Sequence, residues 1–368
     1  MDENIGNDEL AGRCLVVGVA GPVLDGVTAK TFLDLCPAGI ILFSRNLREP
    51  SQILDLMEAL RNTCAPALHC IDQEGGLVDR LRAVFPRFPP VELLADSGND
   101  DVLYQYGKWT GDILSAFGFN VNFAPVVDLK FHDEKNALQK RYLGKNPETV
   151  GRLARRYLQG LQSVPVTGCC KHFPGLGRAR LDSHYELPEI QASLRELLSQ
   201  DILPYRLVRE ELRTVMINHA AYPQLQQKVA QPGSGSAAAA AAAAHTPPAS
   251  CSPAVYKLLR EELGFRGIAV TDDLDMQAVH QVISSEQIPL RAFDAGADLL
   301  LIGENLDFAR TCRDRLAESF EDPNRRHEAL NRTTKLKSIP PAPRVDVLRV
   351  RELATGFEEW KKSLGLGD

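Results

Sequence analysis

Short apolar runs recur along the chain, separated by segments whose apolar positions follow a helical period. Eight of these runs have the length expected of buried strands, at 15–20, 40–43, 67–71, 121–127, 164–170, 215–218, 268–271 and 298–302. Helical patterns lie between many of them, for example at 148–161 and 254–263. This alternation favours a parallel sheet, and eight repeats favour closure into a (β/α)8 barrel of the TIM type. We therefore expect an α/β fold.

Length and composition fit one such barrel with extra helices. The chain has 368 residues, of which 44% are hydrophobic and 24% charged, as in ordinary globular proteins. A low-complexity insertion at 231–244 ends in eight alanines and offers no side-chain chemistry. A proline-rich lead at about residue 340 is followed by a helical tail. We expect one domain over residues 1–368, without room for a second large one.

Charge and cysteine usage narrow the class of partner. The formal net charge is -6, so no basic face is expected for nucleic acid. No apolar run approaches the ~20 residues that a membrane-spanning helix needs, and the acidic start MDENIGNDEL does not resemble a signal peptide. The eight cysteines lack C-x-x-C spacing, which is typical of reduced thiols. We expect a cytoplasmic protein that binds a small molecule, and we favour a monomer.

The stretch KHFPGLGRARLDSH, at 171–184, concentrates titratable groups directly after an apolar run. Asp182 and His184 are two residues apart, so in an extended loop the carboxylate can accept a hydrogen bond from the imidazole and raise its basicity. That pair would make a general acid/base. In isolation, the same motif is more often a turn or capping Asp followed by a surface histidine.

A second candidate follows the apolar strand 268–270. Asp272 and Asp273 come at its end, where α/β barrels keep their chemistry and where a carboxylate could act as a nucleophile. We expect one of the two to cap the next helix, which leaves the other for chemistry. His219 ends another strand and either lines the same site or is a satisfied core histidine.

A third candidate is IDQEGGLVDR, at 71–80, which again places an acid at a strand end. Asp72 could accept hydrogen bonds from sugar hydroxyls while Arg80 donates to another polar group. Gly75 and Gly76 could equally serve only the turn. The segment NFAPVVD, at 122–128, repeats the strand-end acid, and RYLG follows downstream at 141–144.

Taken together, these segments resemble the bacterial β-N-acetylhexosaminidases of glycoside hydrolase family three. The matching stretches span most of the chain in family order and are GIILFSRN (39–46), IDQEGGLVDRL (71–81), NFAPVVDL (122–129), RYLG (141–144), KHFPG (171–175), DSH (182–184) and TDDLDM (271–276). KHFPG followed by DSH at this spacing, with DQEGG and the strand-end DDL, is highly specific.

The resemblance implies a role for each matching position. Asp272 would be the nucleophile and His184 the acid/base, with Asp182 as its partner. Sugar contacts would come from Asp72, Arg80, Arg141, Lys171 and His172. The implied reaction is retaining hydrolysis of terminal β-linked N-acetylglucosamine from cytoplasmic peptidoglycan fragments during cell-wall recycling. No metal or cofactor is implied.

The chain departs from the family pattern in the loop after KHFPG. Leu176 stands where the family usually has the histidine of PGHG, and the stretch 178–180 is also atypical. A leucine side chain cannot donate or accept a hydrogen bond. We therefore expect the loop's hydrogen bonding, and its contacts beyond the cleaved sugar, to differ.

Three other functions remain open on the sequence alone. One is a related β-glycosidase or a glycoside phosphorylase, because a neutral histidine admits phosphate more readily than a carboxylate would. A second is a non-catalytic barrel that binds muropeptides, suggested only by the altered PGLG loop. An esterase-like hydrolase is disfavoured because the chain lacks a G-x-S-x-G motif.

Overall fold

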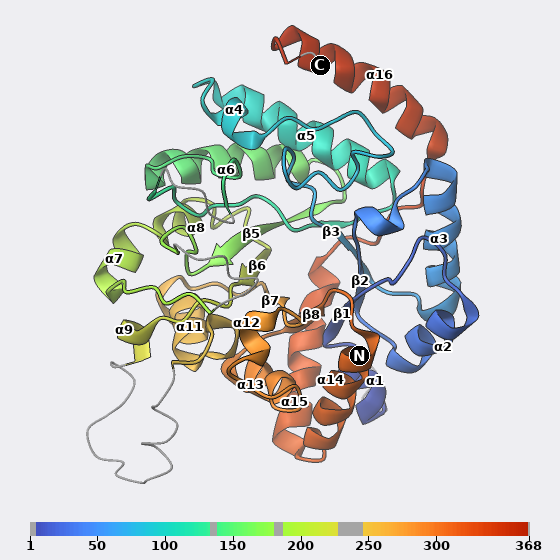
Figure 1. The fold of residues 1–368 in the computed structure, drawn as a ribbon, viewed down its shortest axis with the longest axis vertical. Helices are drawn as coiled ribbons and strands as arrows, with labels where there is room; N and C mark the ends of the chain where they lie inside the picture. Colours follow the sequence, from blue (N-terminus) through green and yellow to red (C-terminus); the bar gives the residue numbers. More distant parts are fainter. Residues whose placement is uncertain (1–4, 133–137, 180–186, 227–245, 367–368) are drawn as a thin grey trace.

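The computed structural model describes residues 5–132, 138–179, 187–226 and 246–366. Eight parallel strands form a closed barrel in sequence order, and β8 pairs with β1 to complete it (Figure 1). The predicted fold class is therefore confirmed. The strands are β1 (Leu15–Gly18), β2 (Gly39–Leu42), β3 (Leu68–Ile71), β4 (Val121–Asn122), β5 (Thr167–Phe173), β6 (Thr214–Ile217), β7 (Ile268–Asp273) and β8 (Leu299–Ile302).

Helices surround the barrel and also extend its connections (Figure 1). In the described ranges they are α1 (Asn7–Gly12), α2 (Gly26–Leu35), α3 (Pro50–Cys64), α4 (Val91–Ala95), α5 (Asp100–Ala116), α6 (Pro147–Leu161), α7 (Leu194–Ser199), α8 (Leu203–Leu207), α9 (Pro223–Gln226), α11 (Pro253–Lys257), α12 (Gln277–His280), α13 (Ile288–Ala295), α14 (Leu306–Ser319), α15 (Pro323–Thr334) and α16 (Val347–Ser363). A π-helical segment, Leu258–Glu262, continues α11. Within the described ranges, no helix combines the length and apolar character needed to cross a bilayer.

Two strands differ from the sequence prediction. The strand predicted at 164–170 begins later and runs to Phe173, so Lys171 and His172 belong to β5 itself and not to a following loop. The strand predicted at 121–127 is regular only over Val121–Asn122. Pro125 has no N–H to give to a ladder, and pairing resumes beyond it as an isolated bridge between Val126 and Lys171.

The barrel interior is filled by apolar side chains from alternate strand positions. They include Val16, Ile41, Leu68, Cys70, Val121, Cys169, Met216, Val270 and Leu301. Ile339 and the partly buried Leu336 pack against this cluster from the segment after α15, and the Asn120 side chain donates to the Pro340 carbonyl at 2.8 Å. Because Asn120 precedes β4, this segment covers the amino end of the barrel. The carboxyl end is the one that carries polar side chains.

Helices α5 and α6 pack closely because glycines lie at their contact. Asn146 caps α6 by accepting a hydrogen bond from the Thr149 N–H at 2.8 Å, and Pro147 suits the first turn. A Cβ added at Gly160 would lie 2.0 Å from the Tyr104 carbonyl oxygen. Only glycine allows this approach.

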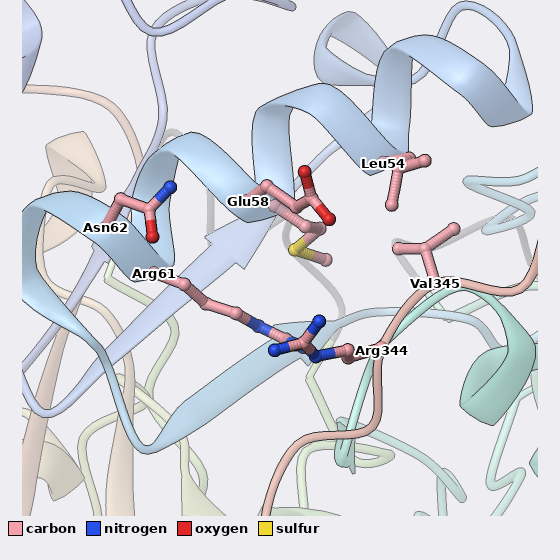
Figure 2. Close-up of a pocket in the computed structure, with 7 residues that line it drawn as sticks. Leu54, Glu58, Arg61, Asn62, Arg344 and Val345 are labelled. Carbon is pink, nitrogen blue, oxygen red and sulfur yellow. The ribbon is translucent and has the colours of Figure 1, made fainter.

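The C-terminal helix α16 packs against α5 and α3. The segment before it is tied to α3 by Arg61, whose guanidinium donates to the Pro343 carbonyl. A hollow of about 240 Å³ lies at this junction. Figure 2 shows Arg61 and Arg344 side by side in it, with Glu58 above them. None of the sequence-predicted site residues lines this hollow, so it is separate from the candidate site.

Candidate active site

Polar side chains gather at the carboxyl ends of the strands, as the sequence predicts. Asp72 follows β3, Lys171 and His172 lie near the end of β5, and Asp272 is the penultimate residue of β7. Asp128 follows the short β4 and His219 follows β6. Six side chains from five strands are thereby brought to one end of the barrel.

A cluster of two acids and three cations forms one side of the site. Lys171 Nζ lies 2.7 Å from Asp72 Oδ1 and 2.6 Å from Glu74 Oε1. Arg141 binds Glu74 in a bidentate manner, with Nε 2.7 Å from Oε2 and Nη2 2.9 Å from Oε1. Arg80 Nη2 is 3.6 Å from Asp72 Oδ2 and its guanidinium lies over the Phe43 ring. The structure thus brings Asp72, Glu74, Arg80, Arg141 and Lys171 into one cluster, in which Arg80 joins through Asp72.

The charges in this cluster stabilise one another. Burial alone would raise the pKa of Glu74, but Arg141 and Lys171 outweigh burial and hold this pKa well below its usual range. Burial would likewise lower the pKa of Lys171, but Asp72 and Glu74 outweigh it and raise that pKa. Both pKa shifts keep Glu74 and Lys171 charged. Asp72 and Arg80 are the more exposed members, with 14% and 29% of their side chains accessible, so they are the ones best placed to contact a ligand.

His172 is oriented by Asp128. Its Nδ1 lies 2.7 Å from Asp128 Oδ2, and its main-chain N–H donates to the same oxygen at 3.1 Å. A carboxylate only accepts, so Nδ1 carries the proton. Nε2 has no hydrogen-bond partner among the described residues and can serve a ligand.

The altered loop position is accommodated through the main chain. The Leu176 N–H donates to Asp128 Oδ1 at 2.6 Å, and the Leu176 side chain is buried. The Asn218 side chain donates to the His172 carbonyl at 3.0 Å. Tyr222 Oη donates to the Gly175 carbonyl at 2.8 Å. The segment from His172 to Leu176 is therefore held at several points without a side chain at 176 that can hydrogen-bond.

The two acids of the TDDL motif lie in different environments. Asp273 Oδ1 accepts from the N–H groups of Asp275 at 3.0 Å and Gly303 at 2.9 Å, and burial raises the pKa of Asp273 to about 7. A Cβ at Gly303 would lie 2.2 Å from Asp273 Oδ2, so the carboxyl is enclosed. Neither acid caps the next helix, because the N-cap of α12 is Met276 and no side chain bonds there. The expectation of a capping acid was wrong; Asp273 instead closes a turn and ties β7 to the end of β8.

Asp272, by contrast, is ionised and partly accessible. Burial would raise its pKa, but His172, the Asp273 N–H and the Lys171 ammonium help to outweigh burial and lower it. Its Oδ1 accepts only the N–H of Asp273, at 2.9 Å, and its Oδ2 has no hydrogen-bond partner in the described part of the chain. A charged oxygen with this freedom can attack an electrophile.

His219 is a satisfied buried histidine. Its Nε2 lies 2.9 Å from the Asp273 carbonyl oxygen and its Nδ1 lies 2.8 Å from Ser250 Oγ. A carbonyl only accepts, so Nε2 donates and Nδ1 accepts from the serine hydroxyl in the neutral ring. His219 therefore supports the β7 end and does not offer a free nitrogen for proton transfer.

The predicted acid/base pair, Asp182 and His184, lies outside the described residues, as does the insertion at 231–244. Two acids of the site lie in segments that the sequence analysis named, but neither was given a role there. Glu74 follows Asp72 by two positions, and Asp128 ends the NFAPVVD run. Their signal was the same strand-end placement as that of the predicted acids. Among the described residues, no group of three His, Cys, Asp or Glu side chains is arranged to hold a metal ion.

Comparisons with known proteins agree with this geometry. The model of the glycosyl hydrolase family 3 N terminal domain matches residues 23–326. A Beta-hexosaminidase of Pseudomonas aeruginosa is 31% identical over 305 residues, covering 83% of this chain and 81% of the relative. A Beta-hexosaminidase of Neisseria meningitidis serogroup B is 32% identical over 322 residues, covering 83% and 82%.

Solved structures give the same result. A glycoside hydrolase family 3 beta-N-acetylglucosaminidase from Paenibacillus has a TM-score of 0.81 and 27% identity, covering 95% of this chain and 68% of that one. NagZ from Neisseria gonorrhoeae, in complex with zinc ion, has a TM-score of 0.75 and 26% identity, covering 96% and 98%. The resemblance read from the motifs is confirmed: the chain is a glycoside hydrolase and belongs to glycosyl hydrolase family 3.

Proposed function

We propose that this enzyme hydrolyses terminal, non-reducing β-linked N-acetylglucosamine with retention of configuration. The observation that carries the proposal is the contrast between Asp272 and Asp273: only Asp272 combines an ionised carboxylate with an oxygen that has no partner among the described residues. The sugar is supported by the relatives, which are named Beta-hexosaminidase and beta-N-acetylglucosaminidase.

The reaction takes two steps. In the first, Asp272 attacks the anomeric carbon while His184, paired with Asp182, gives a proton to the departing glycosidic oxygen. In the second, His184 takes a proton from water, the resulting oxygen bonds to the anomeric carbon, and the bond to Asp272 breaks. A histidine thus replaces the second carboxylate of most glycosidases.

This cluster of charged side chains binds the sugar. Asp72 accepts from sugar hydroxyls, and Arg80 and His172 Nε2 supply further polar contacts. Lys171 and Arg141, which are almost buried and bound to Glu74, fix the orientation of Asp72 and complete the wall of the sugar subsite. We assign the direct contacts to Asp72, Arg80 and His172 because a side chain that binds sugar must keep an accessible polar atom.

The natural substrates in this proposal are cytoplasmic peptidoglycan fragments, in which N-acetylglucosamine is linked to an anhydro-muramic sugar, and the enzyme acts as a single-domain monomer. All eight cysteines are free thiols, which agrees with a reducing compartment. Hydrolysis of the fragment releases the sugar for cell-wall recycling.

The test compares an aryl N-acetyl-β-glucosaminide with the matching β-glucoside, each with and without inorganic phosphate. We expect release of free N-acetylglucosamine, with the glucoside a far poorer substrate and phosphate without effect on the product. A sugar 1-phosphate product would instead identify a phosphorylase. Binding without turnover of either glycoside would contradict the proposal.

The assignment of His184 has its own test. In a His184→Ala variant, substrates with poor leaving groups should lose about 10²–10⁴-fold in rate, the usual contribution of acid/base catalysis. Activated aryl glycosides should lose far less, because their departing oxygen needs little protonation. Equal losses on both kinds of substrate would remove His184 from this role.

A further inference from the structure

The hollow between α3 and the segment before α16 brings two like charges together. The guanidinium groups of Arg61 and Arg344 lie side by side in it (Figure 2), and its volume is about 240 Å³. Among the described residues, no carboxylate forms an ion pair with either group. Two neighbouring cations without an acid between them create a positive potential that a bound anion neutralises.

Glu58 is the one acid among the described residues that line this hollow, and its side chain is exposed. Burial and the neighbouring Arg344 both lower the pKa of Arg61, and they outweigh Glu58, which raises it. The repulsion between the two arginines is therefore stronger than the attraction of the acid above them. The floor of the hollow stays positive.

The main chain holds the two arginines together despite this repulsion. The Arg61 guanidinium donates to the Pro343 carbonyl, directly before Arg344. Beyond Arg344, the Asp346 N–H donates to the Ala116 carbonyl at 2.8 Å. The chain is thus fixed on both sides of Arg344, and the cationic pair is formed before any ligand binds.

Apolar side chains line the rest of the hollow. Met57 is buried, and Leu54 and Val345 are partly buried. A water molecule takes about 30 Å³ in the liquid, so the hollow has room for a tetrahedral oxyanion that carries a short apolar substituent. Cations paired in this way and set against apolar surface suit an anion with an organic part.

We propose that this hollow binds a phosphate group, free or on a small organic molecule, with its oxygens bridging Arg61 and Arg344. Guanidinium groups bind phosphate oxygens through paired N–H bonds, and two of them match the charge of a dianion. An organic substituent packs on Leu54, Met57 and Val345. The ligand joins α3 to the segment that leads into α16, so it also stabilises the docking of that helix.

Calorimetric titration tests the site with two probes, inorganic phosphate and phenyl phosphate. The buffer would be at low salt, free of other oxyanions and at about pH 8, where both probes are mainly dianionic. Arg344→Gln should weaken binding by about ten-fold or more, as expected when a hydrogen bond between charged groups is lost. Glu58→Gln should tighten binding, because the native carboxylate repels the dianion.

Arg351→Gln is the matched control. Arg351 lies on α16, is exposed and has no hydrogen-bond or ion-pair partner among the described residues, so the change in net charge is the same. This variant should bind both probes as the wild type does. Tighter binding of phenyl phosphate would identify an organic phosphate as the ligand, and equal affinities would identify free phosphate.

Thermal unfolding gives a second readout that needs no enzyme activity. A ligand that binds only the folded protein raises its Tm, so phosphate should stabilise the wild type at constant ionic strength and should not stabilise Arg344→Gln. Absence of saturable binding, affinity that Arg344→Gln leaves unchanged, or equal weakening in Arg344→Gln and Arg351→Gln would overturn the inference. Glu58→Gln, which removes only a surface charge, would overturn it if its binding were weaker than that of the wild type.

Discussion

Glu74→Gln removes the charge that neutralises two buried cations. In the native site Asp72 and Glu74 face the buried cations Lys171 and Arg141, and Arg80 lies 3.6 Å from Asp72 at the more exposed edge. In the variant, the Asp72 carboxylate alone faces the Lys171 and Arg141 cations. The NH2 group of the new amide also points at an N–H group of Lys171 or Arg141, so two donors face each other. Removing one partner of a buried ion pair typically costs about 3–5 kcal/mol. Because the amide oxygen still accepts one bond, we expect a loss of about 3 kcal/mol in the free energy of unfolding.

The same change should weaken the sugar subsite. Lys171 keeps Asp72 as a partner, but the bidentate support of Arg141 is lost. A small misplacement of groups that position a substrate can cost about 10²-fold. We expect kcat/KM for an aryl N-acetylglucosaminide to fall by at least about ten-fold, mainly through a higher KM.

The pH dependence of stability gives an independent check. The folded-state pKa of Glu74 is lowered, so its contribution is present above the unfolded pKa of about 4.3 and is lost as pH falls toward the folded value. Wild-type protein should lose this part of its stability on acidification below about pH 4, and Glu74→Gln should lack it.

Urea unfolding at several pH values measures both effects. Glu92→Gln is the control, because Glu92 pairs with Lys130 at 3.0 Å in a partly exposed setting, where an ion pair is worth about 0–1 kcal/mol. If Glu74→Gln were as stable as Glu92→Gln and had normal KM, Glu74 would not hold Lys171 and Arg141 in place as described above.

Three other changes probe separate parts of the structure. Asp273→Asn should flatten the pH dependence of unfolding between about pH 4 and 7, because a carboxyl whose folded pKa is raised to about 7 stabilises the fold below its unfolded pKa and loses that contribution as pH rises; a slope unchanged from wild type would contradict this. Asp128→Asn should lower kcat by about 10²-fold, because His172 loses the acceptor that fixes its tautomer, and should also cost about 1–3 kcal/mol of stability, because the amide NH2 faces an N–H donor of His172 or Leu176; unchanged kinetics would exclude that role. Gly160→Ala should cost about 1–3 kcal/mol by forcing α5 and α6 apart, whereas Gly26→Ala, with nothing within 4 Å of the added Cβ, should not; equal urea midpoints for the two variants would count against the packing argument.

The sequence predicted the barrel well because strand burial leaves a local signal. Apolar runs such as 268–271 have to fill the barrel on both faces, and the acids that follow them mark the carboxyl end. The sequence did not predict how far β5 extends, because Lys171 and His172 interrupt the apolar pattern. Their place in the strand is made possible by Asp72 and Asp128, which come from distant segments.

The sequence predicted most of the side chains that gather at the site, but it gave no role to the acids that hold them in place. Glu74 and Asp128 resemble ordinary loop acids until folding places them against Lys171, Arg141 and His172. The expected helix cap at Asp272 or Asp273 failed for a related reason: Asp273 is held by the Gly303 N–H at the end of β8, a contact that local spacing does not encode.

The identity of the nucleophile is the central claim, and trapping of the glycosyl-enzyme tests it most directly. Wild-type protein would be incubated with a slow fluorinated N-acetylglucosaminide and digested, and the labelled residue would be located by mass spectrometry. The account predicts label on Asp272 and none in the Asp272→Ala variant. Label on Asp273, or turnover that continues while no residue is labelled, would contradict it.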